Sequence, residues 1–230
     1  MEVFRLQQFS VKQSAEVFRV GTDAMLLGAM ADVPGKISAL EIGTGTGIIS
    51  LILAQRNPQL EILAIDIDEN AANLAEENFR NSVFSDRLSV QQTDFNIFNP
   101  EEKFDLIISN PPFFDENISA KDKIARQKVA LSFEDLIFKS AVLLREEGVF
   151  SVIIPSADSQ NFIDLAKNCK LHLIHKINIF GIEGGSLRRN ILEFSLAKKE
   201  ISERDFTIEK RPRIYSPEYL ELTKDLHLFQ

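Results

Sequence analysis

The sequence has 230 residues, of which 44% are hydrophobic and 26% are charged. This composition excludes a disordered chain and is typical of a folded domain with its own core. The formal net charge of -8 counts against a nucleic-acid partner, since phosphate neutralisation requires a basic surface, although a local basic face can exist on an acidic protein.

Three features bear on the compartment. No apolar run approaches the roughly 20 residues that a membrane-spanning helix needs. Residues 1–10 include acidic Glu2 and no apolar block, so a signal peptide is not expected. Cys169 is the single cysteine, which excludes an internal disulfide. We therefore expect a cytoplasmic protein without membrane contact, and we expect a monomer because no obligate protein partner is predicted.

Short apolar runs alternate with amphipathic stretches after an N-terminal extension, residues 1–34. We expect strands at residues 37–42, 60–65, 88–92, 104–109 and 149–154, and helices at residues 48–55, 71–79, 133–144 and 159–168. Two further β-like segments, residues 171–180 and 190–197, are joined through glycines and predict an antiparallel hairpin at one edge. A polar tail, residues 206–230, completes a single domain. The alternation predicts an α/β fold with a mostly parallel sheet covered by helices on both faces.

A glycine-rich turn, Gly43-Thr44-Gly45-Thr46-Gly47, follows the first of these strands. Glycine permits a tight turn and lets backbone N–H groups approach a ligand. The dinucleotide-binding fingerprint fails, because Ile48 stands where its sixth position needs glycine. Glu41 precedes the turn, Asp66 ends the second strand and Asp94 follows the third. This arrangement resembles motif I and the following acidic positions of class I S-adenosylmethionine methyltransferases.

That resemblance implies a Rossmann-like class I methyltransferase fold with a seven-stranded sheet, and S-adenosylmethionine as the cofactor. It implies that Glu41 lies near the methionine moiety, that Asp66 accepts the ribose hydroxyls and that Asp94 receives the adenine amino group. The expected cofactor-binding residues are Glu41, Gly43, Thr44, Gly45, Gly47, Asp66, Ile67, Asp94, Phe95 and Asn110. A plain turn with solvated acids is the alternative interpretation.

The sharpest motif is Asn110-Pro111-Pro112-Phe113, directly after the fourth expected strand. The prolines stiffen the loop and lack N–H donors, so nearby carbonyl groups stay available as acceptors. Asn110 adds a side-chain oxygen, and Phe113 offers a flat face for stacking on a base. Accepting both hydrogens of a conjugated amino group pulls its nitrogen toward tetrahedral geometry and exposes its lone pair. The four residues therefore suit methyl transfer to an amino nitrogen by positioning and hydrogen bonding, with no metal.

The motif resembles motif IV of amino-directed methyltransferases, in which Tyr is usual at the position of Phe113. The resemblance implies that Asn110, Pro111, Pro112 and Phe113 are the catalytic residues. It does not separate adenine from release-factor glutamine, from a guanine amino group in ribosomal RNA, or from adenine in ribosomal RNA or DNA. A non-catalytic factor that binds S-adenosylmethionine or RNA is a further alternative, against which the intact motif speaks.

The N-terminal residues favour one substrate. Residues 4–13 and 18–29 resemble the start of bacterial tRNA1(Val) adenine methyltransferases, and residues 215–219 are similar to that family's ending. The resemblance extends over nearly the whole chain and implies methylation of N6 of adenine 37 in tRNA1(Val). Taken alone, Thr22 or Asp23 is also a sensible cap for a helix that begins there.

Three groups of basic residues are candidates for binding the tRNA. The expected contacts are Lys121, Lys123, Arg126 and Lys128 after motif IV, and Arg188 and Arg189 near the hairpin; Arg5, Lys12 and Arg19 form a third group. Charge runs are also common on solvated faces, so the alternative is that these residues touch only water. The histidines have no metal-ligand spacing, and no metal is expected.

Overall fold

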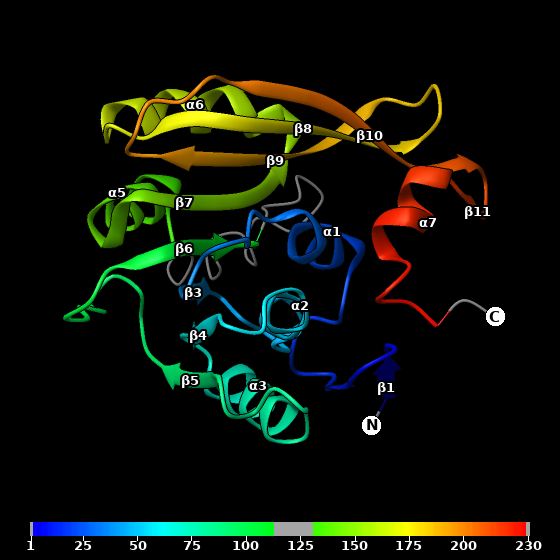
Figure 1. Cartoon of the computed structure of the whole chain (residues 1–230), viewed down its shortest axis with the longest axis horizontal. Coiled ribbons are helices and arrows are strands. Elements are labelled where there is room, and N and C mark those ends of the chain that lie inside the picture. The colour runs from blue at the N-terminus through cyan, green and yellow to red at the C-terminus, as the bar shows by residue number, and fades with distance from the viewer. Residues whose placement is uncertain (1, 113–130, 229–230) are drawn as a thin grey trace, which may run out of the picture.

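The computed structural model describes residues 2–112 and 131–228. Within these residues the main sheet has nine strands in the order β11-β10-β8-β9-β7-β6-β3-β4-β5 (Figure 1). The strands are β3 (Ser38–Ile42), β4 (Glu61–Asp66), β5 (Leu88–Gln92), β6 (Phe104–Ser109), β7 (Leu144–Pro155), β8 (His172–Ile182), β9 (Leu187–Ser195), β10 (Ser202–Arg211) and β11 (Ile214–Tyr215). Only the pairs that involve β9 or β11 are antiparallel. The predicted α/β fold with a mostly parallel sheet is confirmed.

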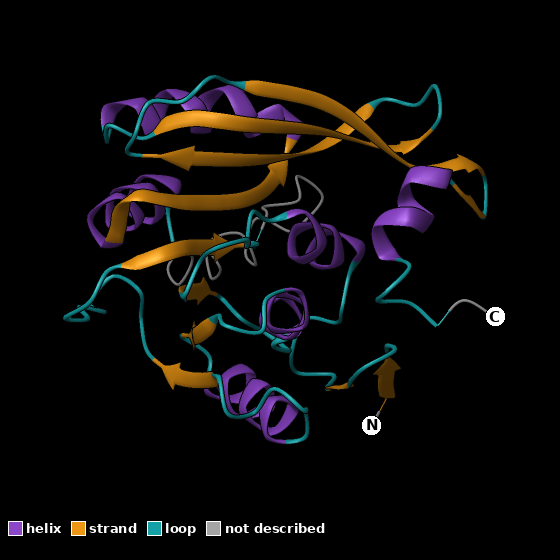
Figure 2. Cartoon of the chain, viewed as in Figure 1, coloured by secondary structure: helices purple, strands orange, loops and turns teal. Residues whose placement is uncertain are grey.

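Helices cover both faces of this sheet (Figure 2). One face is covered by α1 (Thr22–Met30), α2 (Ile48–Arg56) and α3 (Glu69–Arg80), and the other by α5 (Phe133–Leu143) and α6 (Ser159–Asn168). A 3-10 turn, η1 (Ser156–Asp158), precedes α6, and a separate two-stranded sheet is formed by β1 (Glu2–Arg5) and β2 (Ser10–Gln13). The C-terminal helix α7 (Pro217–Thr223) packs against β10 and α1.

Two features of the sheet differ from the prediction. Among the described residues the main sheet has nine strands rather than seven. The β8–β9 hairpin is not an edge, because β10 pairs in parallel with β8 and continues the sheet. Phe206, where we expected a tail to begin, lies inside β10. We did not predict β10 because most of its side chains are exposed or only partly buried. Residues 202–205 are exposed, and Phe206 is the only buried side chain of this strand. Few apolar residues leave little period-two signal.

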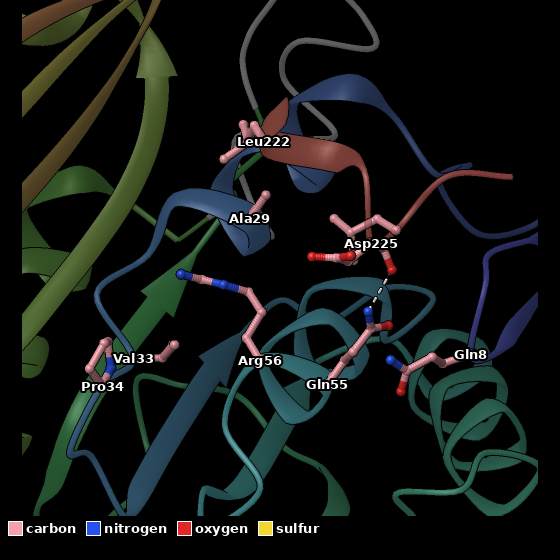
Figure 3. A pocket seen from close by; sticks show the side chains of 9 residues that line it. Gln8, Ala29, Val33, Pro34, Gln55, Arg56, Leu222 and Asp225 are labelled. Carbon is pink, nitrogen blue, oxygen red and sulfur yellow. Dashed lines mark hydrogen bonds between the residues drawn. The ribbon is translucent and has the colours of Figure 1, made fainter. Parts of the chain in front are cut away.

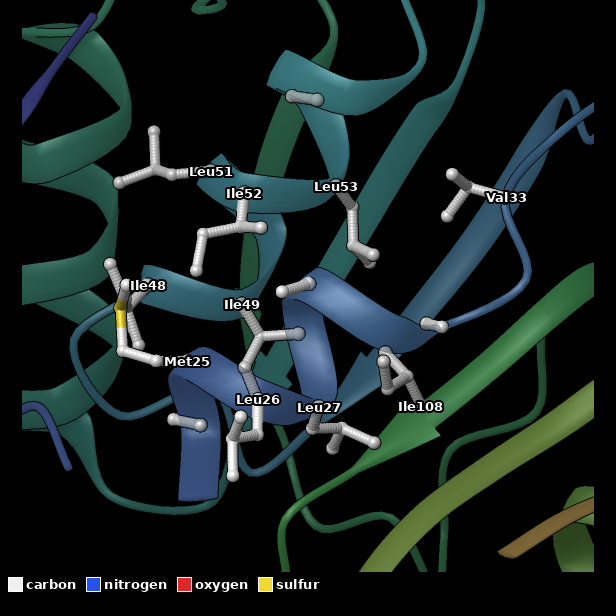
Figure 4. Close-up of a cluster of buried hydrophobic side chains, with 14 of the residues drawn as sticks. Met25, Leu26, Leu27, Val33, Ile48, Ile49, Leu51, Ile52, Leu53 and Ile108 are labelled. Atoms are coloured by element: carbon white, nitrogen blue, oxygen red, sulfur yellow. The ribbon is translucent and has the colours of Figure 1, made fainter. Parts of the chain in front are cut away.

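The core follows the alternation of side chains along each strand. Ala39 of β3 packs with α1 and α2, whereas its neighbour Leu40 packs with the cluster under α5 and α6. Helices α1 and α2 are buried on nearly every side because they pack on each other as well as on the sheet (Figure 4). Gly28 permits their close approach, since a Cβ there would lie 3.1 Å from Ile52 Cβ.

The strand order reverses at β3. The chain passes from β3 to β4 and β5 on one side, then returns to place β6 on the other side of β3. Ligands of open α/β sheets bind outside the carboxyl ends of the strands at such a reversal. The turn after β3 and the residues after β6 therefore lie where the topology opens a crevice.

The two ends of the chain are joined. The Gln7 backbone N–H donates to Leu226 O at 3.0 Å, and its side-chain amide donates to His227 O at 2.9 Å. Phe4 and His227 meet edge to face with ring centroids 6.3 Å apart. The N-terminal extension and the C-terminal segment are thus held to one another.

Two negative observations apply to the described residues alone. None of their helices has the length and apolar character needed to cross a bilayer. None of their His, Cys, Asp and Glu side chains form a group of three or more that could hold a metal ion.

Candidate functional site

The glycine-rich turn has a backbone conformation that is strained for any residue other than glycine. Gly43, Gly45 and Gly47 have φ angles of 73°, 56° and 80°, in the left-handed region. At Gly47, the N-terminal cap of α2, a Cβ would lie 2.5 Å from Phe79 Cε1. The turn is pinned to β4, because the Gly43 and Thr44 N–H groups both donate to Ile65 O, at 2.9 and 3.1 Å. Its shape is set before any ligand arrives.

Glu41 is a buried carboxylate beneath this turn, with 1% of its surface exposed. Its Oε2 accepts hydrogen bonds from Thr44 Oγ1 at 2.9 Å and from the Ser50 N–H at 3.1 Å, and also from the Ser50 hydroxyl. Its Oε1 is buried without a hydrogen-bond partner among the described residues. Burial raises the pKa of Glu41 to about 7, against the opposing effect of these donors. An unpartnered buried acceptor is costly, and it points to a missing donor at this place.

Asp66 connects the turn to the next strand. Its Oδ2 accepts from the Gly45 N–H at 2.9 Å and its Oδ1 accepts from the Asp68 N–H at 3.0 Å. Burial raises the pKa of Asp66, opposed by these two hydrogen bonds. Each carboxylate oxygen still has a free lone pair, so hydroxyl donors can be accepted as well.

The third acid, Asp94, begins a tight turn after β5. Its Oδ1 accepts from the Asn96 N–H at 2.8 Å, which leaves Oδ2 without a partner among the described residues. The Phe95 side chain is buried in the core, with Lys139 Nζ 5.3 Å from its ring centroid. Contact between Phe95 and a cofactor would therefore run mainly through its backbone. Ile67 is 44% exposed beside Asp66, and an apolar side chain in that position suits the face of an adenine.

The residues after β6 lie beside the glycine turn. Ile42 and Ser109, the last residues of β3 and β6, are register partners in a parallel pair. The chain continues from them into Gly43 and Asn110, so both loops leave the same edge of the sheet at adjacent strands. Asn110 is half-buried, and no described residue hydrogen-bonds to its side-chain amide. The predicted proximity of the two loops is present in the structure.

One residue that sequence reasoning missed holds the N-terminal extension against this site. Asn78 of α3 is 1% exposed; its Oδ1 accepts from the Lys12 N–H at 2.8 Å, and its Nδ2 donates to Lys12 O at 3.1 Å and to Thr46 O at 2.9 Å. Val17 of the N-terminal extension packs with Ala71 of α3. Val17 also lies close to the glycine turn, because a Cβ built on Gly45 would be 4.0 Å from Val17 Cγ1. The available signal was a single Asn within an otherwise apolar helix face, which is too weak to identify.

Of the three basic groups that are candidates for binding RNA, the structure describes the pair in β9 and the N-terminal group, Arg5, Lys12 and Arg19. Phe113 of the catalytic motif and Lys121, Lys123, Arg126 and Lys128 lie outside the described residues. Arg188 is exposed, whereas Arg189 Nε donates to Asp23 Oδ2 at 2.9 Å. The predicted capping by Thr22 or Asp23 is wrong, since α1 has Gly21 at its N-cap and no side-chain cap bond. Asp23 binds Arg189 instead.

The third basic group is partly engaged elsewhere. Lys12 forms an ion pair with Glu77, and Arg19 Nη1 lies 3.1 Å from Glu2 Oε2. A phosphate that binds Lys12 or Arg19 would have to compete with the carboxylate of Glu77 or Glu2, respectively.

A cavity of about 410 Å³ lies elsewhere, between the C-terminal segment and the ends of α1 and α2 (Figure 3). Gln55 Nε2 donates to Asp225 O at 2.7 Å, and Arg56 Nη1 donates to Gly28 O and Ala31 O at 2.7 and 2.8 Å. These residues stand at the C-terminal end of α2, whereas the glycine turn stands at its N-terminal end. The first contact attaches the C-terminal segment to α2 and the other two join α2 to the end of α1, and the cavity lies outside the candidate site.

Comparison with known proteins identifies relatives of this chain. A family model for the methyltransferase small domain matches residues 11–169. A tRNA1(Val) (adenine(37)-N6)-methyltransferase from a Flavobacteriaceae bacterium is 48% identical over 231 residues, covering 100% of both chains. A protein of the same name from Flavobacterium johnsoniae is 40% identical, covering 98% of this chain and 99% of its own.

A solved structure shares the fold. The predicted O-methyltransferase from Agrobacterium tumefaciens superposes with a TM-score of 0.71 at 20% identity, covering 89% of this chain and 96% of its own. At that identity the likeness bears on the fold alone.

Proposed function

The chain belongs to the methyltransferase small-domain family and, within it, to the tRNA1(Val) (adenine(37)-N6)-methyltransferases, and we infer from this membership what it does. It transfers the methyl group of S-adenosylmethionine to the exocyclic N6 amino group of an adenine in tRNA. The observation that carries this conclusion is similarity over the full length of both chains to enzymes of that name.

The residues around the glycine turn fit the cofactor of this family. S-adenosylmethionine supplies a methyl group on a positively charged sulfur and carries an ammonium, a ribose and an adenine. We propose that Oε1 of Glu41, buried without a partner in the described structure, takes the donor that it lacks from the methionine end. Asp66 would accept the ribose hydroxyls and Asp94 the adenine amino group. Gly43, Thr44, Gly45 and Gly47 would pass close to the cofactor, with Ile67 and the backbone of Phe95 at its adenine.

The residues after β6 suit the target amino group. We propose that Asn110 Oδ1 and the Pro111 carbonyl accept the two hydrogens of N6, which turns the nitrogen lone pair toward the methyl group. Pro111 and Pro112 lack N–H groups, so neither competes for the local carbonyls. Phe113, which lies outside the described residues, is proposed to stack on the extruded base. Positioning and hydrogen bonding by these residues would then supply the rate enhancement, because they would hold the nitrogen for attack on the methyl group.

The finer substrate assignment is a proposal. The relatives' name specifies adenine 37 of tRNA1(Val), and we propose the same nucleotide for this chain. We propose that the enzyme acts as a single-domain monomer, and that it works in the cytoplasm, where its tRNA substrate is found. Lys121, Lys123, Arg126 and Lys128, with Arg188 and Arg189, are proposed to border the tRNA.

The test uses an unmodified tRNA1(Val) transcript, purified protein and S-adenosylmethionine, followed by mass spectrometry of the tRNA nucleosides. N6-methyladenosine is expected at position 37 with the unsubstituted enzyme. Asn110→Ala should lower the rate by at least about 100-fold while the cofactor dissociation constant changes little. Asn96→Ala is the matched control, because Asn96 is an exposed asparagine at the same sheet edge.

Other outcomes would redirect the assignment. Methylation of a release factor, ribosomal RNA or DNA in place of tRNA would show that the labelled molecule is the substrate. Cofactor binding without transfer to any of these would identify a non-catalytic binding protein.

A further inference from the structure

The hairpin between β10 and β11 carries a group of basic and aromatic side chains that the proposed function has not used. We propose that this group, Lys210, Arg211, Arg213 and Tyr215, is a contact surface for the tRNA substrate. We call it the C-terminal hairpin surface. The inference rests on the proposed tRNA methylation and adds to it a further region, remote in sequence from the Asn110 motif, that holds the RNA.

The hairpin surface lies at the same edge of the sheet as the candidate site. β10 runs parallel to β8, with Glu209 opposite Ile182, and the Glu183 N–H donates to Glu209 O at 2.9 Å. The end of β10 therefore lies at the carboxyl edge, as does the end of β6 (Figure 1). Four strand spacings, roughly 19 Å, separate β6 from β10 across the sheet. Through the pairing register Glu203 is level with Ser109, so Lys210 lies roughly 23 Å farther along the strand and the direct separation is roughly 30 Å. A polynucleotide can reach across that distance, whereas one nucleotide or a glutamine side chain cannot.

The cations of the hairpin surface are exposed and available. Lys210, Arg211 and Arg213 are all exposed, and no ion pair joins any of them to an acid within residues 2–112 and 131–228. Many other basic side chains are bound to acids, as Lys12 is to Glu77 and Arg189 is to Asp23. The formal net charge is -8, so a local group of free cations departs from the rest of the chain. Phosphate groups are the partner that such a group attracts.

Of the acids in β10 (Glu203, Asp205 and Glu209), Glu209 lies nearest in sequence to these cations and has a structural function. Glu209 Oε2 accepts from the Arg213 N–H at 3.3 Å, and the β10–β11 pairing has a register shift between Glu209 and Arg211. Arg213 has a φ angle of 65°, so the chain turns sharply there. Bulges and tight turns re-aim side chains, and here three cations project from one short hairpin.

Tyr215 supplies a stacking platform on the same hairpin, where its register partner is Glu209. It is 43% exposed, and its ring lies 4.5 Å from that of Tyr219 at an interplanar angle of 23°. Tyr219 is 3% exposed, and its hydroxyl lies 3.1 Å from His227 Nε2. The buried Tyr219 holds Tyr215 in place and leaves part of its ring open to solvent. A fixed aromatic next to cations is the arrangement with which proteins bind unpaired nucleotides.

The experiment measures binding of the full-length protein to an unmodified tRNA1(Val) transcript at several salt concentrations. Lys210→Gln/Arg211→Gln should weaken binding about tenfold and lower the slope of log affinity against log salt by about 1 to 2. Lys103→Gln/Lys198→Gln removes the same charge from exposed lysines at the opposite edge and should leave both quantities within about twofold of the starting protein. Cofactor affinity should not change in either variant.

Tyr215 is tested separately. Tyr215→Ala should weaken tRNA binding about tenfold, whereas Tyr215→Phe retains the ring and should bind as the unsubstituted protein does. Unchanged affinity and salt slope in Lys210→Gln/Arg211→Gln, together with unchanged affinity in Tyr215→Ala, would overturn the hairpin surface. If the unsubstituted enzyme still methylated the tRNA, the proposed function would stand. Absence of both tRNA binding and methylation in the unsubstituted protein would overturn the two together.

Discussion

Ser109 Oγ donates a hydrogen bond of 3.0 Å to the main-chain oxygen of Ile42, joining the last residue of β6 to the last residue of β3. Both residues are buried, at 1% and 4% exposure. The bond lies directly behind the two loops of the candidate site, the glycine turn after Ile42 and the Asn-Pro-Pro segment after Ser109. It fixes their separation, and methyl transfer depends on that separation to within a fraction of an ångström.

Ser109→Ala should therefore lower the turnover number more than it weakens cofactor binding. Losing one buried hydrogen bond should cost about 1 kcal/mol of stability. The matched control is Ser151→Ala, because Ser151 is equally buried on β7 and its Oγ has no partner among the described residues. That control should leave stability unchanged or raised. Kinetics with both variants decide the point, and equal turnover in the two would contradict a positioning function for Ser109.

Gly47→Ala should damage the cofactor site through the backbone. Alanine at a φ of 80° is strained, and its Cβ would lie 2.5 Å from Phe79 Cε1. We expect a loss of about 2 to 4 kcal/mol of stability and at least tenfold weaker cofactor binding. Gly21→Ala is the control, since Gly21 has a φ of -116° and nothing within 4 Å of an added Cβ. Denaturant titration and calorimetry measure the two quantities, and equal behaviour of the variants would refute the strain.

Glu41 should make the cofactor-free protein less stable as the pH rises. Its pKa in the folded state is raised from 4.5 to about 7, so the folded chain binds more protons than the unfolded chain between these values. Stability is then fully present below about pH 4.5 and is lost toward pH 7, by on the order of 3 kcal/mol at about 1.4 kcal/mol per pKa unit. Glu41→Gln removes this dependence, and the difference between the two proteins across pH 5 to 8 isolates it from other groups.

The same titration should affect cofactor binding with the opposite sign. Ionised Glu41 attracts a cationic ligand, so cofactor affinity should rise as the pH passes about 7. In Glu41→Gln the affinity should be weaker and its pH dependence smaller. A Glu41→Gln profile identical to that of the unsubstituted protein would show that this carboxylate is not near the ligand.

A second pH effect arises at the opposite edge of the sheet. His175 Nδ1 lies 2.7 Å from Oε2 of buried Glu193, and this hydrogen bond raises the pKa of His175 above 6.5. The pair contributes stability that is fully present below pH 6.5 and is lost as the pH rises through the raised pKa. His175 is partly exposed, so the contribution should stay below about 1 kcal/mol.

The His175 effect is separable by mutation. His175→Gln should be less stable than the unsubstituted protein at pH 5.5, and the difference should shrink at pH 8.5. His172→Gln, on the same strand but away from Glu193, should show no such change. Guanidinium denaturation at the two pH values provides the measurement, and a pH-independent difference for His175→Gln would rule out the ion pair as its source.

The sequence by itself determined the elements whose signals are local. Strands β5 and β6 and helix α6 have the bounds that apolar periodicity predicted, because each buries one regular face or a continuous apolar run. The glycine turn and the Asn-Pro-Pro segment were identifiable for the same reason, since left-handed φ angles and missing N–H groups are properties of the residues themselves. That the two loops share the carboxyl edge follows from parallel strands, whereas their adjacency requires the pairing of β6 with β3.

Tertiary structure decided what depends on partners far apart in the chain. β10 becomes a strand because β8 offers it an edge, although its own residues bury little. Asn78 joins α3 to Lys12 and to the glycine turn, and Arg189 is bound to Asp23 rather than free for RNA. Glu41 titrates near neutral pH because packing, not its identity, removes it from water. The sequence gives the chemical groups of each side chain, whereas the burial of a side chain and its bonding partners depend on contacts between segments that are distant in the chain.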